Sequence, residues 1–115
     1  MAEVRLNKND FLVSETDKSG VITFANDDFC KVSGYSLAEL IGAPHKIIRH
    51  PDMPKEAFKQ LWDTIKSGKT WQGFVKNATK ERGGFYWVFS TVFPTKNGYI
   101  SCRRMASEDE IKEAS

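Results

Sequence analysis

The run Phe85-Tyr86-Trp87-Val88-Phe89-Ser90-Thr91-Val92-Phe93 determines the architecture that the rest of the chain must complete. Successive side chains of a strand point to opposite faces of its sheet, and this run is apolar at both sets of positions. One face carries Phe85, Trp87, Phe89 and Phe93, and the other carries Tyr86, Val88 and Val92. Both faces therefore need a cover. We expect helices and a ligand on one face, and an N-terminal segment or a partner subunit on the other.

Two strand-like runs, Trp71–Thr79 and Tyr99–Met105, flank this central run in the sequence. The three runs are separated by Gly83-Gly84 and by Lys96-Asn97-Gly98, which supply turn residues. Antiparallel neighbours joined by short turns form hairpins, so the sequence predicts a three-stranded meander.

The first half of the chain predicts a hairpin followed by short helices. Phe11–Asp17 and the β-branched run Val21–Phe24 form the hairpin. Asn26 is a good N-cap, and Gly34 offers a left-handed position that ends the first helix. Ser36-Leu37-Ala38-Glu39 has the form of a capping box and begins a second short helix.

One longer helix is predicted from Pro54 to Lys66, with Gly68 as its end. Its apolar residues recur at three- and four-residue steps, which is typical of an amphipathic helix. These residues are Phe58, Leu61, Trp62 and Ile65.

The predicted fold class is α+β: a five-stranded antiparallel sheet with short helices and one longer helix packed on one face. A chain of 115 residues with 40% apolar residues fits one domain with one core. We divide it into an N-terminal cap segment (1–10), a central body (11–106) and the start of a C-terminal helix (107–115). Ser107-Glu108-Asp109-Glu110 carries the cap and the acids of a helix start.

Composition excludes several function classes. The 17 basic and 15 acidic residues are interleaved, so nucleic-acid binding is not expected. The first residues lack signal-peptide features and no apolar run would insert into a membrane, so we expect a cytoplasmic location. Cys30 and Cys102 are isolated, which predicts neither a disulfide framework nor a zinc site. The sequence contains neither a nucleophile with a recognisable base motif nor a glycine-rich phosphate loop, so enzymatic activity is not expected.

Three stretches resemble the PAS superfamily and, within it, one branch. Gly34-Tyr35-Ser36-Leu37-Ala38-Glu39-Leu40-Ile41-Gly42 is similar to the GY-x-x-EL-x-G stretch of PAS domains. Pro44–Pro54, which contains Arg-His-Pro-Asp-Met-Pro, and Gly68–Asn77 resemble the N-terminal PAS domains of bacterial aerotaxis receptors. That resemblance implies FAD as cofactor, redox or oxygen sensing, and signalling to a chemotaxis-type transducer or another output domain. The domain would then be the cytoplasmic sensor part of a membrane-anchored receptor.

The resemblance places Arg49, His50 and Asp52 in a flavin-binding set. Two prolines restrict the backbone of this hexapeptide, residues 49–54, and so hold its polar side chains in place. The guanidinium of Arg49 is suited to phosphate or flavin oxygens. On the residues alone, a second interpretation stays open: Asp52 caps the long helix, and Arg49 pairs with it.

Trp71 and Asn77 lie six residues apart on one predicted strand, an even step that puts both on one face. The resemblance gives both a role at the flavin: an aromatic contact for Trp71, and hydrogen bonds to the pyrimidine edge for Asn77. Without it, Trp71 is core and Asn77 is a strand-end residue. Phe58 joins the candidate set, and Trp62 and Tyr86 are weaker candidates; core packing is the alternative for all three.

Two alternative functions remain at this stage. A haem-binding gas sensor would use His45 or His50 as axial ligand. A ligand-free module would fill its pocket with Trp71, Phe85 and Trp87 and dimerise through the outer sheet face and the N-terminal segment. A photochemical cysteinyl-flavin mechanism is not expected, because no cysteine lies in residues 32–101.

Overall fold

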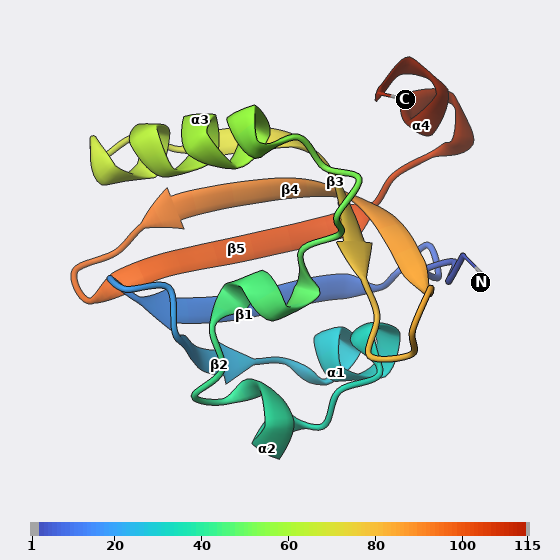
Figure 1. The fold of residues 1–115 in the computed structure, drawn as a ribbon, viewed down its shortest axis with the longest axis horizontal. Helices are drawn as coiled ribbons and strands as arrows, with labels where there is room; N and C mark the ends of the chain where they lie inside the picture. Colours follow the sequence, from blue (N-terminus) through green and yellow to red (C-terminus); the bar gives the residue numbers. More distant parts are fainter. Residues whose placement is uncertain (1–2, 115) are drawn as a thin grey trace.

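The computed structural model describes residues 3–114, and its strands form one antiparallel sheet in the order β2-β1-β5-β4-β3 (Figure 1). The strands are β1 (Phe11–Asp17), β2 (Ile22–Ala25), β3 (Trp71–Ala78), β4 (Phe85–Pro94) and β5 (Gly98–Met105). The predicted hairpin and meander are confirmed, with single-residue shifts at several boundaries. Met1, Ala2 and Ser115, the outermost residues of the predicted cap segment and C-terminal helix, lie outside the described residues.

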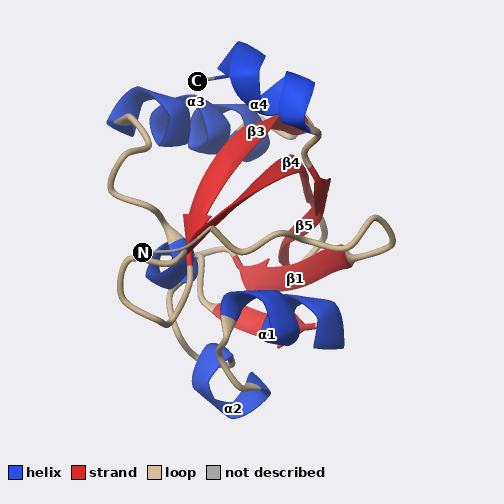
Figure 2. Ribbon diagram, turned by 90° about the vertical axis from the view of Figure 1, so that its right-hand side faces the viewer, coloured by secondary structure: helices blue, strands red, loops and turns tan. Residues whose placement is uncertain are grey.

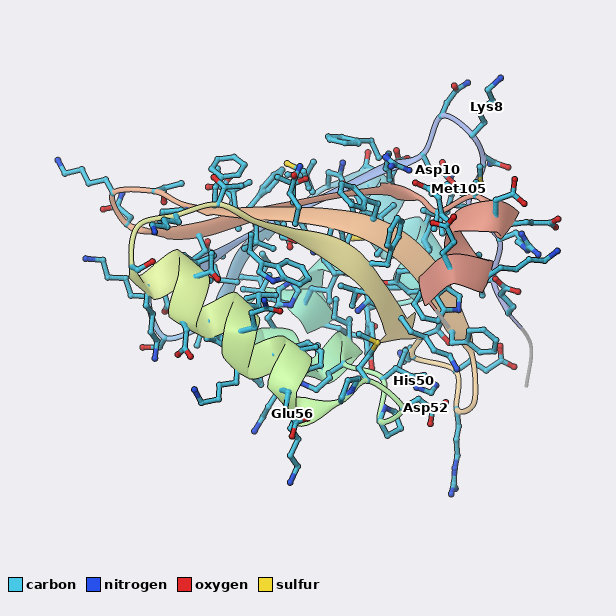
Figure 3. All side chains as sticks on the ribbon, turned by 90° about the horizontal axis from the view of Figure 1, so that it is seen from above. Lys8, Asp10, His50, Asp52, Glu56 and Met105 are labelled. Carbon is cyan, nitrogen blue, oxygen red and sulfur yellow. The ribbon has the colours of Figure 1, made fainter. Side chains whose placement is uncertain are left out.

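Four helices pack against one face of the sheet (Figures 1 and 3). They are α1 (Asp27–Ser33), α2 (Leu37–Leu40), the 3-10 helix η1 (His45–Ile48) and α3 (Lys55–Lys66). Figure 2 shows how strongly the sheet twists, so that β3 and β4 run across the direction of β1. The predicted fold class is confirmed, with the longer helix α3 on the same face as the short ones.

Asn26 joins the first helix to the first strand. Its Oδ1 accepts hydrogen bonds from the backbone N–H of Phe29 (3.0 Å) and of Val13 (3.1 Å). Its Nδ2 donates to the carbonyl oxygen of Phe11 at 2.8 Å. The predicted N-cap is confirmed, and the same side chain also orders the backbone of β1.

Removing this side chain is expected to destabilise the domain. Asn26→Ala leaves two backbone N–H groups and one carbonyl without their partner, so the free energy of unfolding should fall by about 2 kcal/mol. Urea unfolding followed by circular dichroism measures the loss. The control is Asn97→Ala in an exposed turn, which should change little. Equal stability of the two variants would contradict the role assigned to Asn26.

The inner face of the sheet carries the buried core, which includes Leu12, Phe29, Leu40, Tyr86 and Val88. The aromatic residues on the other face of β4 are only partly buried, as the alternation predicted. Along the described chain, the N-terminal segment reaches this strand at its beginning, where the N–H of Val4 donates to the carbonyl oxygen of Phe85 at 2.7 Å. This contact lies at the beginning of β4, and the N-terminal cover of the outer face stays a prediction.

The helix α4 (Glu108–Ala114) follows β5 and extends beyond the sheet (Figure 1). Ser107 and Glu110 form the expected capping box, with N···O distances of 2.9 and 3.1 Å. Arg104 of β5 holds Glu110 through two contacts of 3.1 Å. Arg5 contacts Glu108 at 3.2 Å. The beginning of α4 is therefore tied both to the central sheet and to the N-terminal segment.

Candidate ligand-binding cavity

A cavity of about 280 Å³ lies between the inner face of the sheet and the helices η1 and α3. This volume lies just below the usual range for small-molecule sites, about 300 to 1,000 Å³. The apolar part of its wall consists of Ile48, Phe58, Leu61, Trp62, Ile65, Val75 and Val92. The polar part includes Ser14, His45, Asn77, Ser90, Ser101 and Arg103. A mainly apolar cavity with a few converging polar groups is typical of a ligand site.

Arg103 is the dominant polar group of the cavity wall. It is 2% exposed, yet no carboxylate pairs with it among residues 3–114. Its Nη2 donates to Ser14 Oγ at 2.8 Å and its Nη1 donates to Ser101 Oγ, while Nε has no hydrogen-bond partner in the described structure. Burial lowers the pKa of Arg103 to about 10, so the group stays protonated at neutral pH. The cavity therefore contains an uncompensated positive charge.

His45 stands beside this charge at the beginning of η1. Its Nε2 lies 3.0 Å from Ser14 Oγ, which already accepts a hydrogen bond from Arg103 and can donate its own proton to the ring. Burial and the positive charge of Arg103 lower the pKa of His45 to about 3. The imidazole is therefore neutral at physiological pH.

The low pKa of His45 predicts acid sensitivity of the domain. A histidine with a pKa near 6.5 in the unfolded chain and about 3 in the folded one binds more protons when unfolded, so stability falls as the pH drops below 6.5. Between pH 7 and pH 5 the loss is about 2 kcal/mol. Urea titrations at both pH values measure it, and His45→Gln should show a smaller difference. An unchanged pH dependence in that variant would contradict the assignment.

Asn77 points into the cavity from β3. Its side chain is 4% exposed, and Oδ1 has no hydrogen-bond partner in the part of the chain described. Its backbone pairs with Arg49, which brings the end of β3 next to the hexapeptide. A buried amide with a free acceptor is costly in an apolar wall unless a ligand satisfies it.

Trp71 occupies the same face of β3 as Asn77 but does not line the cavity. Its ring lies across Gly73, where an added Cβ would meet the ring at 2.6 Å. It packs against the buried core instead. The six-residue spacing thus placed both residues on one face, while the missing side chain at Gly73 lets the indole fold over the strand.

The three polar residues of the hexapeptide have different surroundings. Only Arg49 lines the cavity, and its Cζ lies 4.1 Å from the ring centroid of Phe58, which also lines it. Asp52 is bound by Lys76 at 3.0 Å, so it neither pairs with Arg49 nor caps α3. Nδ1 of His50 accepts a hydrogen bond from the N–H of Asp52, and the ring centroids of His50 and Phe85 are 6.0 Å apart. His50 and Asp52 lie side by side in the loop before α3 (Figure 3).

The remaining candidate residues also differ in whether they line the cavity. Trp62 lines the cavity, whereas Tyr86 is fully buried in the core and burial raises its pKa well above the ordinary range. Phe85 and Trp87 alternate with the buried residues of β4 and do not line the cavity, so neither fills it, as a ligand-free module would require. The arrangement also disfavours haem binding, because His50 lies outside the cavity and Nε2 of His45 is hydrogen-bonded to Ser14.

Sequence reasoning missed Arg103 and the serines around it. The alternation of side chains along β5 could have revealed them. Ser101 and Arg103 share the inward face of β5, while Cys102 and Arg104 point outward. An arginine on a strand is ordinarily a solvent-facing residue, so its inward position was not expected.

Comparisons with known proteins identify a family and several relatives of this chain. The PAS fold family matches residues 22–107. The chain is 49% identical over 105 residues to the aerotaxis receptor of Escherichia coli strain K12, covering 87% of this chain and 21% of the receptor. It is 33% identical over 85 residues to the nitrogen fixation regulatory protein of Klebsiella pneumoniae, covering 74% and 17%. The chain therefore spans about a fifth of the length of these relatives.

Solved structures agree on the fold. A light-oxygen-voltage domain studied with a flavin analogue matches with a TM-score of 0.77 at 21% identity, covering 90% of this chain and 82% of that one. The PAS domain of a Colwellia psychrerythraea protein matches with a TM-score of 0.76 at 20% identity, covering 85% and 87%. Within residues 3–114, no helix has the length and apolar composition of a bilayer crossing, and no metal-binding group of His, Cys, Asp or Glu is found.

Proposed function

The chain belongs to the PAS family, and we propose that its cavity binds FAD and that the domain reports the redox state of this flavin to an output segment. The observation that carries the proposal is the polar wall of the cavity. Two lining residues, Asn77 and Arg103, each have a buried polar atom, Oδ1 and Nε, without a partner within the described residues. A ligand with both donors and acceptors on one edge satisfies such a wall.

A flavin ring fits these residues chemically. Its pyrimidine edge offers carbonyl acceptors and an N–H donor, which the guanidinium of Arg103 and the amide of Asn77 complement. The tricyclic ring is flat and largely apolar, and it suits a wall formed by Ile48, Phe58 and Trp62. The 49% identity to an aerotaxis receptor supports flavin over other ligands of this fold.

A bound flavin supplies reversible electron uptake, and this chain's residues convert it into movement. The Asn77 amide can turn to present either its donor or its acceptor. Arg103 responds to negative charge in the cavity, since it is a buried cation of the wall without a carboxylate partner among residues 3–114. Its neighbour Arg104 points outward and holds Glu110 of α4, so a displacement of β5 at Arg103 reaches the output helix within one residue.

The remaining parts of the proposal concern context. We propose a cytoplasmic sensor without enzymatic activity, in line with its isolated cysteines and its lack of nucleophile motifs. Its partners are FAD and a downstream signalling domain in the same or a partner chain. A second copy of the domain, bound through the outer sheet face and the N-terminal segment, belongs to the same proposal.

An absorption spectrum of the purified domain tests the proposal. Two flavin bands that bleach on addition of dithionite and return in air are expected, and chromatography after heat release should identify FAD. A Soret band would favour a haem sensor. A colourless protein that takes up no added flavin would overturn the proposal and favour the ligand-free module.

A further inference from the structure

The opening of the cavity is marked by its exposed lining residues. Three lining residues are exposed in the described structure, and all belong to η1 or its flanks: Pro44, Lys46 and Arg49. The other lining residues are buried or partly buried. The opening to solvent therefore lies along the outer edge of η1, and two of its three residues are cations.

These two cations have no counter-charge. Within residues 3–114, neither Lys46 nor Arg49 forms an ion pair, although the nearby Asp52 is bound by Lys76 and Glu39 by Lys80. The guanidinium of Arg49 is held over the ring of Phe58, which fixes its position at the cavity edge. Two adjacent unpaired cations at the opening of a cavity attract an anionic ligand group.

The depth of the lining residues determines which part of a ligand meets these cations. Asn77 and Arg103 of the polar wall are buried, whereas Lys46 and Arg49 are exposed at the opening. A flavin nucleotide whose ring lies against the buried wall therefore directs its phosphate chain toward the opening. Resting on the proposed function, we propose that Lys46 and Arg49 bind the phosphate groups of the flavin nucleotide, and that Lys46 is a binding residue in addition to the hexapeptide.

The division of roles follows from side-chain chemistry. Arg49 presents a planar fork of donors that is already stacked in place, which suits paired hydrogen bonds to one phosphate. Lys46 is a flexible point charge three residues earlier, which suits a second contact without strict geometry. The ring-binding wall, by contrast, lies deeper and does not include Lys46's charge. Phosphate affinity and ring affinity are therefore separable by mutation.

The experiment titrates the flavin-free domain with riboflavin, FMN and FAD, following the quenching of flavin fluorescence at low and high salt. The variant is Lys46→Glu, with Lys46→Gln as a milder form. The matched control is Lys8→Glu, an exposed lysine remote from α3 and the cavity (Figure 3). Circular dichroism checks that each protein is folded.

Lys46→Glu is expected to weaken FAD binding about tenfold or more, to flatten its salt dependence, and to leave riboflavin affinity within about twofold. An equal loss for FMN and FAD places Lys46 on the phosphate they share, and a loss for FAD alone places it on the second phosphate; both support the proposal. Riboflavin affinity falling as much as that of FAD, or Lys46→Glu behaving like Lys8→Glu, would overturn it. If the wild-type domain binds none of the three flavins, the proposed function itself fails.

Discussion

Replacing Arg103 with methionine is expected to make the flavin-free domain more stable and to weaken the flavin binding proposed for it. Methionine has a similar length but no charge, so the variant no longer buries an uncompensated cation, and the free energy of unfolding should rise by about 1 to 3 kcal/mol. The two serines that lose the guanidinium keep other neighbours, His45 at 3.0 Å from Ser14 and Ser90 at 3.3 Å from Ser101. Flavin affinity should fall at least about tenfold, because a charged donor is lost from the cavity wall.

The neighbouring residue provides the control for this experiment. Arg104→Met removes an arginine from the same strand but from its outward face, so flavin affinity should be unchanged while α4 loses its two contacts with Glu110. Urea unfolding of the flavin-free proteins and flavin titration give the two readouts. Retention of wild-type flavin affinity in Arg103→Met would refute the role of this residue in binding.

Asn77→Leu is expected to weaken flavin binding without lowering the stability of the flavin-free domain. Leucine has a similar volume, and Oδ1 of Asn77 makes no hydrogen bond to residues 3–114, so the stability of the flavin-free domain should not decrease. Flavin binding should weaken by about 10- to 100-fold, because a polar edge of the ring would face an apolar side chain. The flavin-to-protein ratio after purification and a titration of the flavin-free protein both measure this.

Asn97→Leu, in the exposed turn before β5, is the matched control for the loss of an amide. A wild-type flavin-to-protein ratio in Asn77→Leu would mean that the amide faces the cavity without touching the ligand. A large loss of stability in the flavin-free variant would instead show that Asn77 is a structural residue of β3.

The fold followed from local signals, because each turn and cap acts within a few residues. Asn26, Gly34 and the Ser36–Glu39 capping box mark helix ends through bonds to the adjacent backbone. The alternation of 85–93 determined the two faces of β4 directly. Such signals need no knowledge of distant contacts, which is why the strands and the helices α1, α2 and α3 could be predicted almost to the residue, whereas η1 was not.

The site was less accessible to this reasoning, because cavity lining depends on side-chain direction and on neighbours far along the chain. The alternation of side chains along the strand predicted the face of Asn77, but it could not show that the ring of Trp71 would lie across Gly73. Asp52 met Lys76 of β3, a partner that proximity in sequence did not indicate. Arg103 was missed because its partner Ser14 becomes visible only when β1 and β5 are paired.

One residue at the start of β4 joins two segments that are otherwise separate. The ring of Phe85 contacts His50 of the hexapeptide and lies 4.4 Å from Lys76 Nζ, and its carbonyl holds the amide of Val4. Loosening of the loop before α3 is therefore expected to release the amide of Val4 as well. The rate of deuterium uptake at the Val4 amide should therefore report how often the loop before α3 opens.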